Sequence, residues 1–203
     1  FADGSFTIAG TDRSIDIMEL AKKLHDAKMP EGVPDSLDVD HTSEPVPSAF
    51  PNGCHVCEVE IDPETGVTRV VRYTTVDDVG IAVNPMLVTG QIHGGVAQGI
   101  GQALMEEVSY DASGQPITGS FMDYALPRAG DVPSMQVGDH PSPAKSNPLG
   151  TKGCGEAGCA GSLVCIVNAV VDALSEYGIK HINMPLTPER VWRAIQDAKA
   201  NAA

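Results

Sequence analysis

Residues 150–162 form a glycine-dense segment that contains the best-placed candidates for chemistry. Closely spaced glycines leave backbone N–H groups exposed, and an apolar stretch that follows predicts a helix directly after them. Such a segment suits an anion, an oxo group or a phosphate, and a tight packing loop is the alternative. Glu156 lies within it, between Gly155 and Ala157. Its carboxylate is either a first-turn partner of the helix dipole or a catalytic group in a desolvated pocket.

The spacing Gly153-x-Gly155-x-x-Gly158 matches the dinucleotide-binding fingerprint as a pattern. A Rossmann site requires a strand directly before these glycines. Residues 141–151 instead contain three prolines and hardly any apolar side chain. We therefore reject a Rossmann fold and keep the exposed N–H groups as the useful feature of the segment.

A second glycine-rich segment, residues 90–104, has five glycines in fifteen residues. Asn84 and Pro85 predict the start of a helix that runs into it, as an N-cap and a first-turn proline. Each glycine costs about 0.5–1 kcal/mol relative to alanine in a helix interior. We therefore expect another backbone or a ligand to come very close here. His93 is interpreted as a packed or hydrogen-bonded side chain, because no ligand partner lies three or four residues on.

The five cysteines do not predict a metal centre. Cys54 and Cys57 have the spacing of a metal knuckle or redox pair, but in a strand residues three apart point to opposite faces. No second pair of this spacing completes four ligands. Cys154 and Cys159 flank Glu156, and a reactive role for them stays open, although spacing places no histidine beside them. We interpret Cys54 and Cys57 as structural and predict no metal-ligating residue.

Composition and charge exclude several classes of protein. The 203 residues include 13 Lys and Arg against 27 Asp and Glu, a net charge of −14, which argues against phosphate-neutralising nucleic-acid binding. The most apolar stretch, residues 163–174, is too short for a membrane span and carries Asn168 and Asp172. The absence of a signal-peptide pattern and of a dense disulfide framework predicts a cytoplasmic location. Because the chain starts at Phe1, we expect an excised piece of a longer protein.

The first half of the chain predicts short strands and two helices. We expect a strand at residues 5–8 and a helix capped by Asp16, with Glu19 as reciprocal partner and Ile17, Leu20, Ala21 and Leu24 as its apolar stripe. Residues 29–53 contain five prolines and predict an irregular crossing. Residues 54–62 and 67–76 are rich in β-branched side chains and predict a β-hairpin.

The second half predicts another hairpin and two helices. Residues 107–124 are expected to form a hairpin that turns near 111–114, followed by a proline-rich connection over 127–148. A buried helix should run to Tyr177 and stop at Gly178. Thr187 should cap a last helix over 188–198, with Val191, Trp192 and Ile195 on its buried side. These elements predict a single mixed α+β unit spanning residues 1–203.

Residues 90–104 and 150–158 together closely resemble the C-terminal part of the molybdenum-binding large subunit in the xanthine oxidase and carbon monoxide dehydrogenase family. Asn84-Pro85-Met86 and residues 185–192 look the same. The resemblance covers essentially the whole chain, and two long blocks in the right order are more specific than a single glycine pattern. It implies that residues 1–203 are the C-terminal portion of a molybdopterin-binding domain, either a fragment of a longer chain or one half of a naturally split subunit.

The resemblance also implies a cofactor and a set of site residues. Members of this family hold molybdenum on a pyranopterin, usually the cytosine dinucleotide in bacteria, and hydroxylate or dehydrogenate small substrates. Glu156 then matches the glutamate that takes a proton from the metal-bound hydroxyl as it attacks the substrate carbon. Gln91 matches the pterin-facing amide, which can both donate and accept. Lys152, Gly153 and Gly155, in the Lys-Gly-x-Gly-Glu loop, are expected to contact the cofactor.

The same resemblance implies that other chains complete the enzyme. Nothing here resembles the remaining cofactor-binding loops or the copper-linked cysteine loop, and the sequence has no iron–sulfur spacing and no flavin site. We expect the remainder of the molybdenum subunit, an iron–sulfur subunit and an FAD subunit as partners. The isolated chain should then bind no cofactor and be inactive. A non-catalytic binding or assembly module with the same scaffold is the alternative.

Overall fold

The computed structural model describes residues 1–202 and divides the chain into two compact units, Phe1–Pro45 and Val46–Ala203. The α+β class is confirmed. The division differs from the single unit predicted. The proline-rich segment explains it, because residues 27–51 form no helix or strand. The irregular crossing predicted there is confirmed, apart from its last two residues, which begin a strand.

The first unit contains a small antiparallel sheet and one helix. Strand β1 (Ser5–Thr7) pairs with β2 (Ser14–Asp16), and α1 (Ile17–Asp26) follows directly. The Asp16 carboxylate accepts from the backbone N–H of Met18 at 2.8 Å and of Glu19 at 3.4 Å, which confirms the predicted cap. The apolar stripe of α1 is half-buried at most, and no residue of α1 is fully buried.

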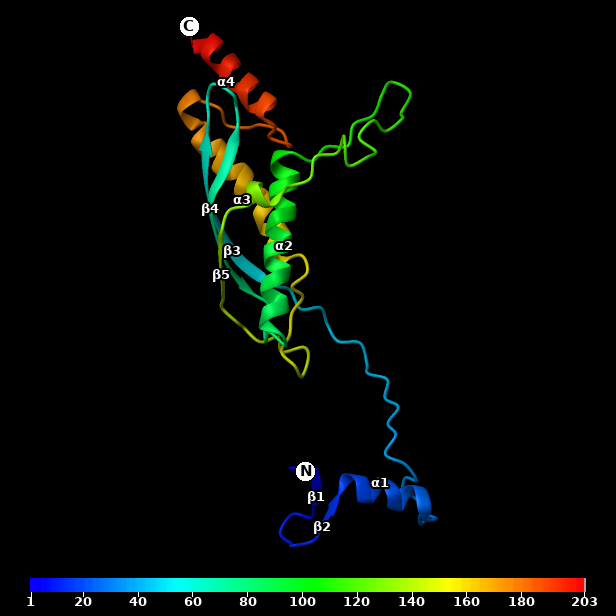
Figure 1. Cartoon of the computed structure of the whole chain (residues 1–203). Coiled ribbons are helices and arrows are strands. Elements are labelled where there is room, and N and C mark those ends of the chain that lie inside the picture. The colour runs from blue at the N-terminus through cyan, green and yellow to red at the C-terminus, as the bar shows by residue number, and fades with distance from the viewer. Residues whose placement is uncertain (203) are drawn as a thin grey trace. The chain divides into compact units, whose positions relative to one another are not determined.

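A three-stranded sheet forms one layer of the second unit (Figure 1). Strands β3 (Asn52–Ile61) and β4 (Thr68–Asp78) are the predicted antiparallel hairpin, with a bulge at Glu58/Val59. Strand β5 (Met135–Asp139) pairs parallel to β4. The sequence prediction missed β5, because it is short, it lies within a proline-rich connection, and its partner is far away along the chain.

Helices cover one face of this sheet (Figure 1). Helix α3 (Ala157–Ala173) packs on β3 and against α2 (Pro85–Leu104), and α4 (Pro188–Ala202) ends the described chain. Short 3-10 turns lie at Ala129–Asp131 (η1) and Ser175–Tyr177 (η2). The fully buried side chains at the centre include Tyr73, Ile92, Val96, Ile100, Ile166, Val170, Leu174, Leu186, Val191 and Ile195. Among the described residues, no helix is long and apolar enough to span a membrane.

The predicted helix ends are mostly confirmed, and two predictions of burial are wrong. Asn84 accepts from the N–H of Leu87 at 3.2 Å. Helix α3 ends at Ala173, before the predicted end at Tyr177, and the separate η2 turn continues to Gly178, which has φ 74°. Helix α3 was expected to be buried on nearly every face, but Val164 is exposed because only one side meets the sheet and α2. Trp192 is also exposed, whereas its neighbours Val191 and Ile195 are buried.

Residues 107–124 do not form the predicted hairpin. A single isolated bridge joins Tyr110 and Pro116, and the turn falls at Gly114 as expected, with φ 84°. The segment extends away from α2 and α3 as an irregular arm (Figure 1). Phe121 and Met122 on it are 86% and 92% exposed. Two short strands without a covering layer are marginal in water, which explains the lack of a regular ladder.

Helices α2 and α3 touch backbone to backbone. A Cβ atom built on Gly95 would lie 2.7 Å from the amide nitrogen of Cys159, and one built on Gly158 would lie 2.5 Å from the carbonyl oxygen of Ile92. Real Cβ atoms do not come this close to backbone. The predicted close approach of another backbone to residues 90–104 is therefore confirmed at Gly95.

A pair of alanine substitutions tests this contact. Gly95→Ala should destabilise the protein by about 1–3 kcal/mol, because the new methyl group overlaps the α3 backbone. Gly94→Ala, one residue earlier, has no atom within 4 Å of the new Cβ and should gain about 0.5–1 kcal/mol of helix propensity. Urea unfolding of both variants and the wild type measures the difference. Equal effects of the two substitutions would contradict the packing described.

Candidate functional site

The glycine loop that precedes α3 is joined to the chain that follows β4. The N–H of Ile81 donates to the carbonyl of Gly150 at 3.0 Å, and the N–H of Lys152 donates to the carbonyl of Val79 at 2.9 Å. A Cβ on Gly80, which has φ 65°, would collide with the Gly150 carbonyl. These contacts fix the beginning of the loop against the end of the sheet.

The side chains of Asn147 and Asp78 bind the same loop. The Asn147 amide donates to the Thr151 carbonyl at 2.9 Å and accepts from the Thr151 N–H at 3.1 Å. The Lys152 ammonium donates to the Asp78 carboxylate at 2.5 Å, and both side chains of this ion pair are largely buried. Lys152 therefore anchors the loop in this structure. Its expected contact with a cofactor stays a prediction.

Asp78, the last residue of β4, accepts three hydrogen bonds. Besides Lys152, it accepts from the N–H groups of Gly80 and Ser142, each at 2.9 Å. The hydrogen bond from Lys152, followed by those two from the backbone, lowers the pKa of Asp78 from 3.8 to about 2. The carboxylate is thus ionised at neutral pH and ties three separate stretches of chain together.

Glu156 occupies the N-cap position of α3. Its side chain is exposed and makes no capping hydrogen bond to the first turn. Within residues 1–202, no hydrogen bond from a first-turn N–H group to the Glu156 carboxylate supports its interpretation as a partner of the helix dipole. Nor do residues 1–202 alone enclose Glu156 in a desolvated pocket. Its carboxylate points to no partner and is open to a group that approaches from outside the chain.

The loop around Glu156 has open backbone as well. Gly153 and Gly155 lack positive φ values, and no atom lies within 4 Å of a Cβ built on either, so neither turn geometry nor packing requires glycine there. Within residues 1–202, the N–H groups of Gly153, Cys154, Gly155 and Glu156 have no hydrogen-bond partner. Exposed N–H groups ahead of a helix favour an anionic ligand.

The exposed side of α2 also has glycines with free space around them. Gly90 and Gly94 have no atom within 4 Å of a built Cβ, and Gln91 is exposed between them. Ile92, the next residue, contacts Gly158 of α3 through its carbonyl oxygen. The structure thus brings the two glycine-rich segments together, with Gln91 next to their contact. His93 was interpreted as packed or hydrogen-bonded, and the packed alternative is wrong, because His93 is exposed on the side of α2 that faces away from α3.

Sequence reasoning missed a polar cluster beside Glu156. His55 on β3 and Asp77 on β4 line a cavity of about 350 Å³ together with Glu156, Ala157 and Gly161. The ring of His55 hydrogen-bonds Asp77 through Nε2 at 3.3 Å. The signal was available in the hairpin, because its register sets His55 opposite Thr75, two residues before Asp77.

The five cysteines are free thiols in different surroundings. Cys54 is exposed and Cys57 half-buried, as expected for opposite faces of β3. Burial, with a smaller effect of Cys165, raises the pKa of Cys57 to about 12, and burial followed by the charge of Glu156 raises the pKa of Cys159. The thiolate is the ligating and reactive form, and both groups stay in the thiol form at neutral pH. Across residues 1–202 no group of three His, Cys, Asp or Glu side chains converges as a metal site.

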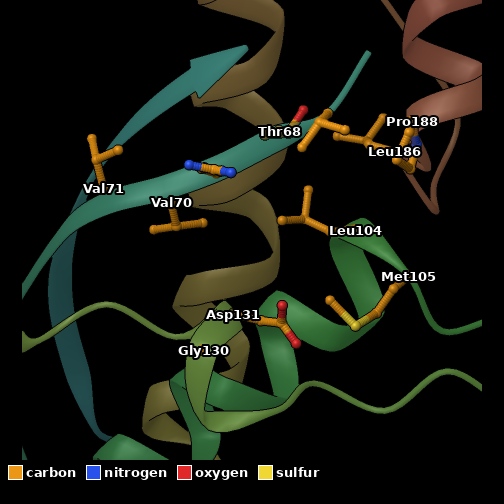
Figure 2. A pocket seen from close by; sticks show the side chains of 11 residues that line it. Thr68, Val70, Val71, Leu104, Met105, Gly130, Asp131, Leu186 and Pro188 are labelled. Atoms are coloured by element: carbon orange, nitrogen blue, oxygen red, sulfur yellow. The ribbon is translucent and has the colours of Figure 1, made fainter. Parts of the chain in front are cut away.

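Another cavity, of about 580 Å³, is lined by neither Glu156 nor the His55–Asp77 pair (Figure 2). Figure 2 shows Val70 of β4, Leu104 at the end of α2, and Leu186 and Pro188 around it. No residue of the glycine loop lines it. Asp131 at its edge accepts from the N–H of Arg128 at 2.8 Å, so its carboxylate already has a partner.

The loop before α3 has open glycines and N–H groups without partners, which suit an anionic cofactor. The Glu156 carboxylate at its end makes no capping hydrogen bond. A family model for a molybdopterin cofactor-binding domain matches residues 1–133, and the chain belongs to this family. The match ends before the loop that carries Glu156. The resemblance to the molybdenum-binding large subunits of the xanthine oxidase family is confirmed.

Relatives align with nearly the whole chain. The carbon monoxide dehydrogenase large chain of Hydrogenophaga pseudoflava is 36% identical over 168 residues, which are 83% of this chain and 21% of that one. The nicotine 6-hydroxylase large subunit of Paenarthrobacter nicotinovorans is 36% identical over 95% of this chain and 24% of its own. Quinoline 2-oxidoreductase from Pseudomonas putida 86 superposes with a TM-score of 0.85 at 38% identity, over 96% of this chain and 25% of that one. The chain thus spans a quarter or less of these relatives.

The Lys152–Asp78 ion pair predicts a pH-dependent stability. The pKa of Asp78 is lowered to about 2 in the folded protein, so the unfolded chain binds the proton first as the pH falls. The pair stabilises the fold fully above about pH 4, and its contribution is lost as the pH falls through about 2. The difference in unfolding free energy between the wild type and Asp78→Asn should therefore shrink over this range. Urea unfolding at each pH measures it, and a constant difference would be inconsistent with the pair.

Proposed function

We propose that this chain is the cofactor-contacting and base-carrying part of a molybdenum-dependent oxidoreductase that hydroxylates or dehydrogenates a small substrate. The observation that carries the proposal is the α2–α3 contact, which joins the glycine-rich segment that contains Gln91 to the segment whose loop glycines and N–H groups are open. Family membership and the names of the relatives support it. Because those relatives are oxidoreductases, a non-catalytic assembly module is not favoured.

The chain's own residues fit a pterin with an anionic tail. Gly153 and Gly155 leave room for close approach, and their N–H groups donate to an anion ahead of α3. The Gln91 amide both donates to and accepts from a heterocycle. Lys152 acts mainly through the loop, since its ammonium is paired with Asp78. When bound, the molybdenum–pyranopterin group supplies the redox centre that takes electrons from the substrate.

Glu156 is the proposed general base. A base must reach the proton that it accepts, and the Glu156 carboxylate is open and makes no capping bond that would hold it back on its own helix. We further propose that the pocket is closed by chain outside these residues, which excludes water and selects the substrate. The carboxylate then accepts one proton from the reacting centre and releases it to solvent when the pocket opens.

We also propose the form of the cofactor, the partner subunits and the cellular compartment. The cofactor is the cytosine dinucleotide form, and the remainder of the molybdenum subunit, an iron–sulfur subunit and an FAD subunit complete the enzyme in the cytoplasm. The short span relative to the relatives supports the need for further chain. The chain on its own is expected to be inactive and free of cofactor.

Glu156→Gln in the assembled enzyme tests the base. The substitution keeps volume and hydrogen-bonding reach but removes proton affinity. Reduction of the enzyme by substrate should slow by at least about 10²-fold, with molybdenum content and melting temperature near wild type. Glu64→Gln, in the turn of the β3–β4 hairpin, is the matched control and should change nothing. Retained activity at normal metal content would overturn the assignment. A loss confined to stability, about 0.3–1 kcal/mol, would instead indicate a dipole partner.

Gly155→Val tests whether the open glycine loop receives the cofactor. No atom lies within 4 Å of a Cβ built on Gly155, and its backbone has no positive φ, so the melting temperature of the chain should hardly change. In the assembled enzyme it should lower the molybdenum and pterin content by about tenfold, because it fills the space that the cofactor needs. Gly119→Val, at an equally open glycine of the arm, is the control. Normal cofactor content in Gly155→Val would contradict the proposed contact.

A further inference from the structure

A buried polar cluster lies between the sheet and the first turns of α3. Tyr73, Thr75 and Asp77 alternate along β4 and therefore share one face, and His55 lies opposite Thr75 on β3. The side chains of His55 and Asp77 are each only 5% exposed. The proposed function makes no use of this cluster, although His55, Asp77 and Glu156 line one cavity.

Hydrogen bonds hold the His55 ring in a single orientation. A carboxylate can only accept, so Nε2 carries the hydrogen that it donates to Asp77 at 3.3 Å. In the neutral ring, Nδ1 then accepts from the Tyr73 hydroxyl at 2.7 Å. The Thr75 hydroxyl donates to the other Asp77 oxygen at 2.6 Å. Both ring nitrogens and both carboxylate oxygens are thus satisfied, and rotation of the ring would break two bonds at once.

The backbone of α3 lies directly on this ring. A Cβ built on Gly161 would come within 2.7 Å of Cε1 and Nε2 and 2.8 Å of Cδ2 of His55. Gly161 follows Glu156 by five residues in the same helix, which starts at Ala157. The imidazole therefore sets the separation between the sheet and the first turns of α3.

A polar cluster is a costly way to fill this space. An apolar side chain would avoid the desolvation of a buried carboxylate, but it would not be held in one rotamer by directed bonds. A fully satisfied network rigidifies its surroundings. The cluster lies beneath the first turns of α3, next to Glu156. Its rigidity therefore acts on the helix end that carries this carboxylate.

We propose that His55 and Asp77 are positioning residues that fix the first turns of α3 on the sheet and thereby place the Glu156 carboxylate. This inference rests on the proposed function, in which Glu156 moves the proton. Displacement of a reacting group by about 1 Å costs up to about 10²-fold in rate, so a small shift of α3 is sufficient to matter.

A double-mutant cycle in the assembled enzyme tests the contact with the ring. Gly161→Ala should slow reduction by saturating substrate by about tenfold or more, because the methyl group pushes α3 away from His55. His55→Gly should slow it as well. In the His55→Gly background, Gly161→Ala should have no further effect, since the ring that it would strike is gone. Independent, multiplicative losses would overturn the proposal.

Hydrogen exchange gives a readout that does not depend on activity. The amides of residues 157–161 should exchange faster in His55→Gly and in Gly161→Ala than in the wild type. Val170→Ala, which removes a fully buried side chain near the far end of α3, is the control for loss of stability. It should lower the melting temperature while leaving both the rate and the exchange of residues 157–161 near wild type. Equal effects of Val170→Ala and His55→Gly would reduce His55 to a structural role and overturn the proposal.

Further variants keep the outcomes separable. Asp77→Asn preserves size but replaces an acceptor oxygen with a donor group, so it should give the same faster exchange and slower reduction if His55→Gly does not assemble. If Glu156→Gln keeps the wild-type rate, the proposed function fails, and hydrogen exchange still tests whether His55 fixes α3. If Glu156→Gln is slow but the His55 and Asp77 variants are not, only the positioning role is wrong.

Discussion

The contact between the backbones of α2 and α3 is the constraint on which the candidate site depends. Gly95 and Gly158 let the two helices meet without side chains between them. Gln91 lies one helical turn before Gly95, and Glu156 lies two residues before Gly158, so both are near this contact. Because a side chain at either glycine would overlap main-chain atoms, the helices have little freedom to slide or separate there.

The sheet contributes a second constraint through two consecutive carboxylates. Asp77 and Asp78 point to opposite faces of β4 and hold different partners. Asp77 binds His55 beneath α3, whereas Asp78 binds Lys152 and so fixes the loop that leads into the same helix. The start of α3 is therefore held from the sheet side and from the loop side. Such rigidity is what a site on a helix terminus needs, because loops alone position side chains poorly.

Local features were predictable from the sequence, and features that depend on distant partners were not. Capping by Asp16 and Asn84 follows from residue type and neighbours, and the close approach at Gly95 followed from the cost of glycine in a helix. The family and the position of the loop were recognisable from its motifs. Strand β5 and the His55–Asp77 pair were missed, because each is defined by pairing with a strand elsewhere in the chain. The hairpin expected over residues 107–124 was wrong, because turn residues predict a reversal of the chain but not a second layer that would cover the two strands.

The glycine contacts also differ in how the sequence can change through evolution. Gly95 faces main-chain atoms of α3, which every amino acid possesses, so no substitution in the opposite helix can make room for a side chain there. Gly99 mainly faces the Ser162 side chain, with the amide nitrogen of Leu163 3.0 Å from a built Cβ. Alanine at 99 is therefore compatible with glycine at 162 together with a small shift of the Leu163 backbone. Among relatives, position 95 should therefore be nearly invariant, while positions 99 and 162 should covary, and an alignment would separate the two kinds of packing without any structure.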